Sequence, residues 1–331
     1  MRRARILSTG MYVPPKVVSN HDLSTMFNTS DEWIVQRTGI QTRHYAEDGQ
    51  GASDLGYEAA CQALDATGVK AHELDLILFA TLSPDVTFPG SSCLLQKRLG
   101  ARGVATLDLR NQCTGFVYGL SVAEQFIATG KYQRILLVGA EVHSSGLDFS
   151  DQGRDVTVLF GDGAGAVVLG PSDDVSRGIL SFDLHADGTE WESLCLVAPE
   201  SRRQPGLTLE MISAGLHYPK MNGKHVFKHA VECLPETIEH SLKEAGYGLG
   251  DVDLLIPHQA NLRINELVAR RLGISDQNVF HNIQRYGNTT AASIPIALHE
   301  ALAQGKLQAG DLLVLAAFGS GFTWGSVVIR W

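Results

Sequence analysis

The sequence lacks any stretch that approaches 18 uninterrupted apolar residues, and it has no low-complexity tract and no long linker. The first absence argues against a membrane span, because a helix needs about 20 apolar residues to cross the hydrocarbon core. The chain starts with MRRARILSTGMYVPP, which is basic and then briefly apolar, but Gly10, Pro14 and Pro15 interrupt the apolar run. We therefore expect an opening strand and no signal peptide.

Cysteine and positive charge are also scarce. The five cysteines are an odd number and form no CxxC pair. We expect reduced thiols in a cytoplasmic protein, with neither a disulfide framework nor a zinc site. The formal net charge is −9, from 27 Lys and Arg against 36 Asp and Glu. This balance argues against a general nucleic-acid binder, although it leaves room for a local basic patch.

The chain has 331 residues, of which 44% are hydrophobic and 19% charged. This length suits one large domain or two ordinary ones. Strand-like apolar runs alternate with segments of helical spacing, which indicates a layered α/β fold. The strand-like runs are 75–81, 103–109, 134–141, 164–170, 252–258, 311–319 and 325–331, and the helical segments are 53–67, 114–129, 228–245, 261–272 and 292–304.

A weak internal echo joins the two halves of the chain. ELDLILFAT at 73–81 resembles DVDLLIPHQ at 251–259, and RILLVGAEV at 134–142 resembles DLLVLAAFG at 311–319. The echo predicts two similar halves, residues 1–172 and 173–331.

One cysteine stands where a strand-like run meets a helical one, in DLRNQCTGFVYGL (108–120). The apolar spacing predicts a helix that begins close to Cys113. At a helix N-terminus the unpaired N–H groups and the macrodipole favour negative charge, so a thiol there ionises more easily and can act as a nucleophile. The alternative is a small buried apolar residue, which is the usual fate of a free cysteine. The other four cysteines lack this context.

Two further residues are candidate partners for that thiol. His258 ends the strand-like run VDLLIPH, and ligands gather at the carboxyl ends of strands in α/β folds. The alternative is a solvated or capping histidine. Asn288 lies in YGNTTAASIP before a helix, where simple turn chemistry would also explain it.

Two glycine-rich stretches have different interpretations. AFGSGFTWGS (317–326) follows an apolar strand and can direct backbone N–H groups at an oxyanion. FGDGAGAVVLG (160–170) has no Lys-Ser/Thr pair and runs into a β-rich segment, so it fits neither a P-loop nor a dinucleotide fingerprint.

With these residues assembled, the chain resembles the β-ketoacyl-acyl-carrier-protein synthase III family of thiolase-superfamily condensing enzymes. Seven ordered motifs that span almost the whole chain carry the resemblance: TSDEWIVQRTGI (29–40), CTGF (113–116), FGDGAGAVVL (160–169), LHADG (184–188), PHQANLRI (257–264), GNTTAAS (287–293) and AFGSGFTWGS (317–326).

The resemblance implies a duplicated thiolase fold in five α-β-α-β-α layers and a homodimer, with no metal and no bound redox cofactor. It implies that Cys113 takes an acyl group from a coenzyme A thioester. His258 and Asn288 would then stabilise the enolate formed when malonyl-acyl carrier protein loses carbon dioxide. The backbone N–H groups of Cys113 and Ser320 would form the oxyanion hole. The implied activity is the initiation of fatty acid synthesis.

The resemblance also assigns binding residues. Trp33 and Arg37 lie one helical turn apart after a capping-box pattern from Thr29 to Glu32, and with Arg154 they would hold the adenine end of coenzyme A. The alternative for Trp33 is simple packing.

A basic helix face is the candidate docking surface for the carrier protein. Arg263, Arg270 and Arg271 share one face at offsets of seven and eight residues, and the alternative is a solvated face.

The chain departs from the family pattern in several places. Asn111 and Gln112 precede the cysteine where small residues are common, Lys224 replaces an asparagine because GNEVF reads GKHVF (223–227), and Ser320 replaces a glycine. The stretch 207–219 looks longer than its family counterpart. The acyl-chain preference is therefore left open.

Three other activities compete with this assignment. One is a related ketosynthase of secondary metabolism, and another is an acyl-binding or acyl-transfer protein that has lost decarboxylation. The intact Cys113–His258–Asn288 set argues against that loss. Thiolase itself is disfavoured, because the last cysteine is Cys233 and no second catalytic cysteine follows near the C-terminus.

Overall fold

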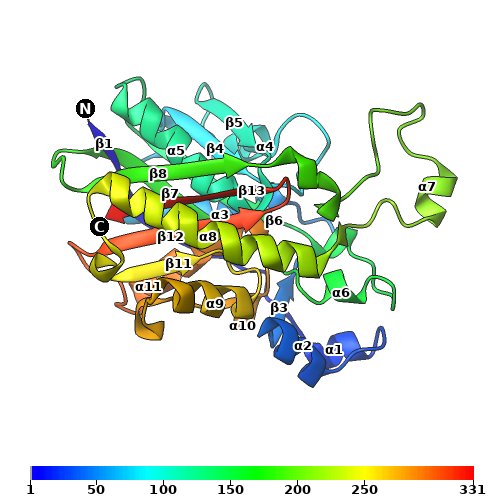
Figure 1. Cartoon of the computed structure of the whole chain (residues 1–331). Helices are drawn as coiled ribbons and strands as arrows, with labels where there is room; N and C mark the ends of the chain where they lie inside the picture. The colour runs from blue at the N-terminus through cyan, green and yellow to red at the C-terminus, as the bar shows by residue number, and fades with distance from the viewer. Residues whose placement is uncertain (1) are drawn as a thin grey trace.

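Two mixed β-sheets form the frame of the protein, in a computed structural model that describes residues 2–331 (Figure 1). The first sheet has the order β1 (Arg3–Tyr12), β7 (Gly163–Ser172), β6 (Ile135–Glu141), β4 (Leu76–Ala80) and β5 (Ala105–Leu109). The second has the order β11 (Leu254–Pro257), β12 (Leu312–Gly319), β13 (Thr323–Arg330) and β8 (Gly178–Ala186). Strands β6, β4 and β5 run parallel, as do β11 and β12, and the other pairs are antiparallel.

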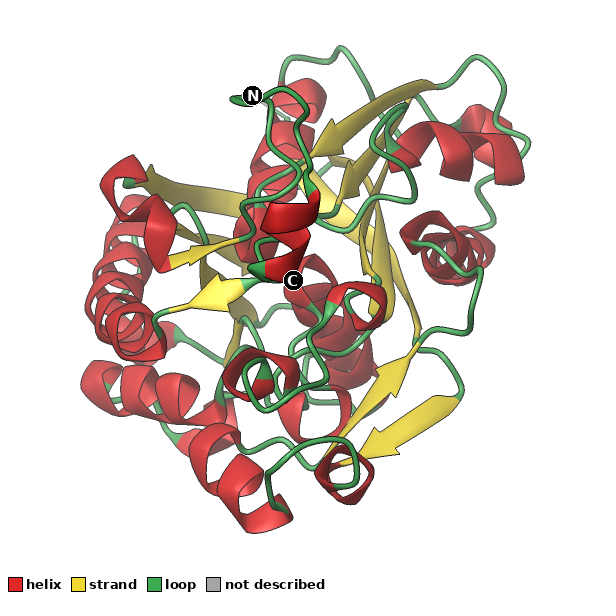
Figure 2. Cartoon of the chain, turned by 90° about the vertical axis from the view of Figure 1, so that its right-hand side faces the viewer, coloured by secondary structure: helices red, strands yellow, loops and turns green. Residues whose placement is uncertain are grey.

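Helices cover both faces of each sheet and so produce five layers (Figure 2). One core cluster joins α3 (Ala52–Thr67) and α4 (Ser91–Arg98) to the outer face of the first sheet. A second cluster holds α5 (Gly115–Ala128) and α11 (Ser293–Ala303) between the two sheets. A third packs α8 (Gly223–Ala245) and α9 (Leu262–Leu272) on the outer face of the second sheet. The predicted thiolase-like α/β fold is confirmed.

The apolar runs predicted as strands are strands because they are covered on both faces. Every residue of β4, β6 and β12 is buried. Such strands read as continuous apolar runs, since neither set of alternating side chains meets water.

The two sequence echoes fall on topologically equivalent strands, β4 with β11 and β6 with β12. The boundary between residues 172 and 173 lies in the connection from β7 to β8 and stays a prediction.

Most predicted boundaries agree with the structure to within two residues, but α8 begins five residues before the predicted start at 228. The side chain of Asn222 accepts a hydrogen bond from the His225 N–H and caps the helix there. The spacing of apolar residues does not reveal this cap, because the first turn of α8 is polar and partly exposed.

Smaller elements surround the end of the sheets where the site lies. They include β2 (Lys16–Ser19), β3 (Thr42–Tyr45), α1 (Asn20–Ser24), α2 (Asp31–Thr38), α6 (Arg154–Thr157), β9 (Leu194–Cys195), β10 (Lys220–Met221) and α10 (Ile283–Tyr286). The segment that carries α7 (Leu209–Ser213) projects from the body (Figure 1). Within residues 2–331, no helix has the length and apolar character needed to cross a membrane.

Candidate active site

Cys113 lies at the strand-to-helix turn that the sequence predicts. Strand β5 ends at Leu109, a 3₁₀ turn (η2, Gln112–Thr114) follows, and α5 begins at Gly115. Gln112 has a φ of 43°, in the left-handed region that a non-glycine residue rarely adopts. The turn is tied to the second sheet, because the Thr114 and Thr323 hydroxyls lie 2.9 Å apart. The thiol is thereby held at the junction of the two sheets.

The glycine-rich turn after β12 closes over the thiol. The backbone N–H groups of Ser320 and of Cys113 itself lie near the sulfur and act to lower its pKa. A Cβ atom on Gly319 would lie 2.6 Å from the Cys113 Cβ and 3.0 Å from its Sγ, so only glycine allows this approach. The Ser320 hydroxyl donates to the carbonyl of Leu194, so this departure from the family pattern is compatible with backbone donation at the sulfur.

His258 follows β11 directly and is buried. Its Nδ1 lies 2.6 Å from the hydroxyl of Ser293, which begins α11. Its Nε2 is buried and has no hydrogen-bond partner among the described residues. A buried polar atom without a partner is costly in a folded protein, and such atoms are common where a substrate is to be bound. His258 therefore offers one ring nitrogen for chemistry.

Asn288 is oriented by the backbone next to it. Its Oδ1 accepts a 2.8 Å hydrogen bond from the Thr290 N–H, which fixes the amide so that Nδ2 is the group left to donate. Thr290 has a φ of 47°, and its hydroxyl lies 2.7 Å from Nε2 of His143. Asn288 lines the same cavity as Cys113.

Burial dominates the electrostatics of these groups. It raises the pKa of Cys113 to about 12, and the nearby carboxylate of Glu141 adds to the effect. The expectation that the helix terminus makes this thiol ionise more easily is therefore wrong for the buried site: loss of hydration outweighs the terminus. Burial also lowers the pKa of His258 to about 3, so both groups are neutral at pH 7.

A cavity of about 1080 Å³ leads from solvent to Cys113 and Asn288, and His258 is not among its lining residues. Cys113 and Asn288 line the buried end of the cavity. Arg37, Lys224 and Arg263 line its exposed end. Its walls are largely apolar. Its charged lining residues are five cations and two acids: Arg37, Arg154, Lys220, Lys224 and Arg263, with Asp155 and Glu192. A cavity that is locally positive in a chain of net charge −9 suits an anionic ligand with an apolar arm.

The structure brings Trp33, Arg37 and Arg154 together on the cavity wall. The Arg37 and Arg154 guanidinium carbons lie 4.3 Å and 4.5 Å from the centre of the Trp33 ring. No adenine ring fits between groups this close, so one guanidinium must move aside for a ring to stack on the indole. The predicted capping box is wrong in detail, since Ser30, and not Thr29, accepts from the Trp33 N–H and caps α2.

The three arginines of α9 form a strip and not a cluster. Arg263 lines the cavity, and its guanidinium carbon lies 5.9 Å from the centre of the Phe227 ring. Arg270 and Arg271 are in the last turn, roughly 10 Å further along the helix axis. Arg271 donates to the carbonyl of Val231 in α8, and Arg270 is exposed.

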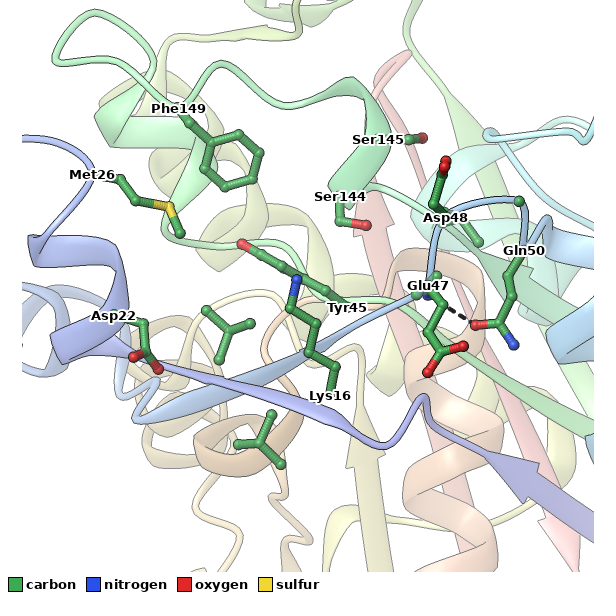
Figure 3. Close-up of a pocket in the computed structure, with 15 residues that line it drawn as sticks. Lys16, Asp22, Met26, Tyr45, Glu47, Asp48, Gln50, Ser144, Ser145 and Phe149 are labelled. Carbon is green, nitrogen blue, oxygen red and sulfur yellow. Dashed lines mark hydrogen bonds between the residues drawn. The ribbon is translucent and has the colours of Figure 1, made fainter.

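A second cavity, of about 620 Å³, lies beside β2 and β3 (Figure 3). Lys16, Tyr45, Glu47 and Phe149 are among its lining residues, and Tyr45 packs edge-on against Phe149. It holds neither a cysteine nor a histidine among its lining residues. The Cys113 cavity is therefore the candidate active site.

Sequence reasoning missed the polar residues behind the site. Glu141 ends β6, and its buried carboxylate accepts hydrogen bonds from Thr81, Leu82 and Ser83, while burial raises its pKa to about 7. Ser293 and Thr290 orient His258 and Asn288 as described above. The one available signal was an acidic residue at the end of the apolar run RILLVGAE.

Comparisons with known proteins agree with this geometry. Residues 107–188 match the family described as 3-oxoacyl-[acyl-carrier-protein] synthase III, and residues 242–331 match its C-terminal part. The beta-ketoacyl-[acyl-carrier-protein] synthase III of Natranaerobius thermophilus is 46% identical and covers 100% of both chains.

Two solved structures extend the comparison. The 3-oxoacyl-[acyl-carrier-protein] synthase III of Aquifex aeolicus is 42% identical with a TM-score of 0.91, over 99% of this chain and 100% of that one. The priming beta-ketosynthase of the R1128 polyketide pathway is 34% identical with a TM-score of 0.92, over 99% and 96%.

Proposed function

The chain belongs to the 3-oxoacyl-[acyl-carrier-protein] synthase III family, and we propose that Cys113, His258 and Asn288 carry out its reaction. In that reaction an acyl group from a coenzyme A thioester is condensed with malonyl-acyl carrier protein, which initiates fatty acid synthesis. The observation that carries the proposal is the shared cavity, whose buried end holds the thiol, two backbone donors at its sulfur and the free amide of Asn288.

The first step is the transfer of the acyl group to Cys113. The sulfur bonds to the acyl carbon, the coenzyme A thiolate leaves, and the proton lost by Cys113 ends on that leaving thiolate. The N–H groups of Cys113 and Ser320 lie near the sulfur, so they are the proposed donors to a carbonyl oxygen bound beside it. Removing one such donor typically costs about 10²–10³ in rate, which makes this pair a main source of acceleration.

The second step is loss of carbon dioxide from the malonyl thioester. The bond to the carboxylate breaks, and its electron pair forms an enolate whose charge lies on the thioester oxygen. Nδ2 of Asn288 and Nε2 of His258 donate to that oxygen. This role requires the tautomer in which the Ser293 hydroxyl donates to His258 Nδ1 and the proton of the neutral ring is on Nε2.

In the last step the enolate carbon attacks the acyl carbon on Cys113, the sulfur leaves as a thiolate, and a proton taken up from solvent restores the neutral thiol. The product is a 3-oxoacyl chain on the carrier protein. His258 acts in this sequence as a neutral hydrogen-bond donor, because its pKa of about 3 keeps the ring uncharged at pH 7.

Substrate binding is assigned to the solvent end of the cavity. Trp33, Arg37 and Arg154 offer a stacking surface and two cations for coenzyme A. Arg263, with Arg270 and Arg271 behind it, forms the strip proposed to dock an acidic carrier protein.

The proposed quaternary state is a homodimer through the edge of the first sheet. Strand β5 has no second neighbour, and its Leu107 is 40% exposed. Phe88, in the loop before α4, is 84% exposed. An open edge beside large exposed apolar side chains is typical of a surface that another chain covers. All five cysteines are free thiols, consistent with the proposed cytoplasmic location.

A mass-spectrometric screen of acyl-CoA thioesters tests the proposal. We expect one acyl group per chain on Cys113, no labelling of Cys113→Ser, and a 3-oxoacyl product when malonyl-acyl carrier protein is added. Labelling that persists on another cysteine would contradict the assignment.

The same screen addresses the related ketosynthases of secondary metabolism. The similarity to the R1128 priming ketosynthase is the observation that supports a role in secondary metabolism as the alternative. A product outside the straight or branched fatty acids would favour it.

A further inference from the structure

Three metal-ligating side chains converge outside the active site, and we propose that they bind a zinc-class divalent cation. Glu190 belongs to a 3₁₀ segment (η4, Gly188–Ser193), and His225 and His229 come from the start of α8. One ligand atom from each lies within 4.8 Å of the other two. Nε2 of His225 and Oε2 of Glu190 are 2.5 Å apart, and the two imidazole centroids are 4.2 Å apart. All three residues are half-buried, so an ion can reach them from solvent.

Helix α8 places the two histidines side by side and fixes the tautomer of one of them. His225 and His229 are four residues apart, and side chains at this spacing lie next to each other on a helix. Nδ1 of His229 lies 2.9 Å from the His225 carbonyl oxygen, which only accepts, so Nδ1 carries the proton. Nε2 of His229 then has a free lone pair. A hydrogen bond from the second ring nitrogen to a carbonyl is the usual way in which proteins orient a metal-bound histidine.

The donor set selects the class of metal. Two imidazoles and one carboxylate suit zinc and its neighbours in the first transition series, whereas magnesium and calcium prefer oxygen ligands throughout. Tetrahedral zinc with bonds of about 2.0–2.2 Å sets its ligand atoms roughly 3.3–3.5 Å apart. The separations that exceed this value, all within 4.8 Å, must therefore close by no more than about 1.5 Å, and the 2.5 Å contact between His225 and Glu190 must open by about 1 Å. Rotation of the Glu190 and His229 side chains, both partly exposed, can supply these movements.

The site is a feature of this chain and not of the family pattern. In GKHVF (223–227), His225 stands where that pattern has glutamate. The resemblance implies no metal, so the proposal goes beyond the proposed function and does not depend on it.

A cation here would join η4 to α8 across one wall of the cavity. Glu192 follows Glu190, and Lys224 and Val226 flank His225, and all three line the cavity. Phe322, whose ring lies 5.3 Å from that of His229, follows the glycine-rich turn that covers the thiol. The metal is thus placed to stiffen the wall on which the substrate chain rests.

The test is zinc binding by the metal-stripped full-length protein, measured by calorimetry and by metal analysis after dialysis. We expect one zinc per chain, not displaced by excess magnesium. Glu190→Gln and His229→Gln should each weaken binding by more than the roughly 10–100-fold typical of losing a partner of a ligand. His240→Gln is the matched control, since His240 is also on α8 but pairs with Asp183, and it should bind zinc like the wild type.

Amide hydrogen exchange gives a second readout that does not rely on binding affinity. Exchange across 188–195 should slow when zinc is added to the wild type, and it should not change in His229→Gln. Circular dichroism and acylation of Cys113 show whether each variant is folded. Absence of stoichiometric zinc would overturn the proposal. So would wild-type binding by both ligand variants, or binding that is lost in Cys113→Ser and retained in Glu190→Gln.

Discussion

Replacing Asn288 by aspartate separates the two roles that this residue could have. The Oδ1 of Asn288 accepts from the Thr290 N–H, and a carboxylate oxygen can accept the same bond, so the turn should survive in Asn288→Asp. The Nδ2 donor is lost and a negative charge replaces it. Asn288→Ala loses both interactions. The pair of variants therefore distinguishes a turn residue from a donor to the enolate.

The magnitudes follow from the contacts. Loss of one donor to the developing charge is worth roughly 3–4 kcal/mol, or about 10²–10³ in the rate of decarboxylation. In Asn288→Asp the carboxylate also opposes the enolate, so this variant should be at least as slow as Asn288→Ala. Both variants should lose stability, but for different reasons: Asn288→Ala loses the hydrogen bond to the Thr290 N–H, at a cost of about 1 kcal/mol, whereas Asn288→Asp keeps that bond and adds the cost of burying a charge.

The assay measures each half-reaction separately. Acyl-enzyme formation is followed by intact mass, carbon dioxide release from malonyl-acyl carrier protein by a radiolabel, and stability by urea unfolding. Acylation of Cys113 should change little in either variant, because the enolate does not exist at that stage. If Asn288→Asp releases carbon dioxide at nearly the wild-type rate, Asn288 is a turn residue and the proposed division of roles fails.

Three further predictions concern the thiol, the turn above it and the docking strip. The pKa of Cys113 is raised to about 12, so the rate of its alkylation by iodoacetamide should increase about tenfold per pH unit from pH 7 to 9 without a plateau. A rate that is already constant below pH 7 would indicate a resting thiolate and contradict this prediction. Gly319→Ala places a methyl group 3.0 Å from the Cys113 sulfur, so it should abolish acylation and lower the free energy of unfolding by about 1–3 kcal/mol. Normal acylation of this variant would refute the close approach of Gly319 to Cys113. Replacing Arg263, Arg270 and Arg271 by Glu should raise KM for the carrier protein and weaken the salt dependence of that KM, while acylation by a small acyl-CoA continues. Equal loss of both half-reactions would show that these arginines have a different role.

Local sequence signals were sufficient for the layered fold and for the position of the thiol. Buried strands such as β6 and β12 are apolar throughout, and the helical spacing after Cys113 is regular, so both are visible without tertiary information. The polar support of the site was not visible. Glu141 and Ser293 act through partners 58 or 35 residues away in the chain, and no local pattern reports such a contact.

The one chemical expectation that failed did so for a related reason. The helix terminus next to Cys113 is a local feature, and it was predicted correctly. The pKa of the thiol depends on everything that covers it, including the Gly319 turn and the carboxylate of Glu141, which come from distant segments. A sequence motif can thus locate a nucleophile but cannot give its ionisation state.

The backbone around the site explains how neutral groups can still perform the reaction. Gln112 and Thr290, at φ values of 43° and 47°, are the non-glycine residues with positive φ in the described chain, and they lie beside Cys113 and Asn288. Such a conformation costs of order 1–3 kcal/mol at each residue and persists only when surrounding contacts impose it. Here the Thr290 N–H and hydroxyl are held by Asn288 and His143. The folded chain therefore supplies the orientation of the Asn288 amide in advance, and in the proposed mechanism the enolate would meet a donor that is already in place. In a buried cavity such fixed dipoles stabilise charge strongly, so the site does not require an ionised residue in its resting state.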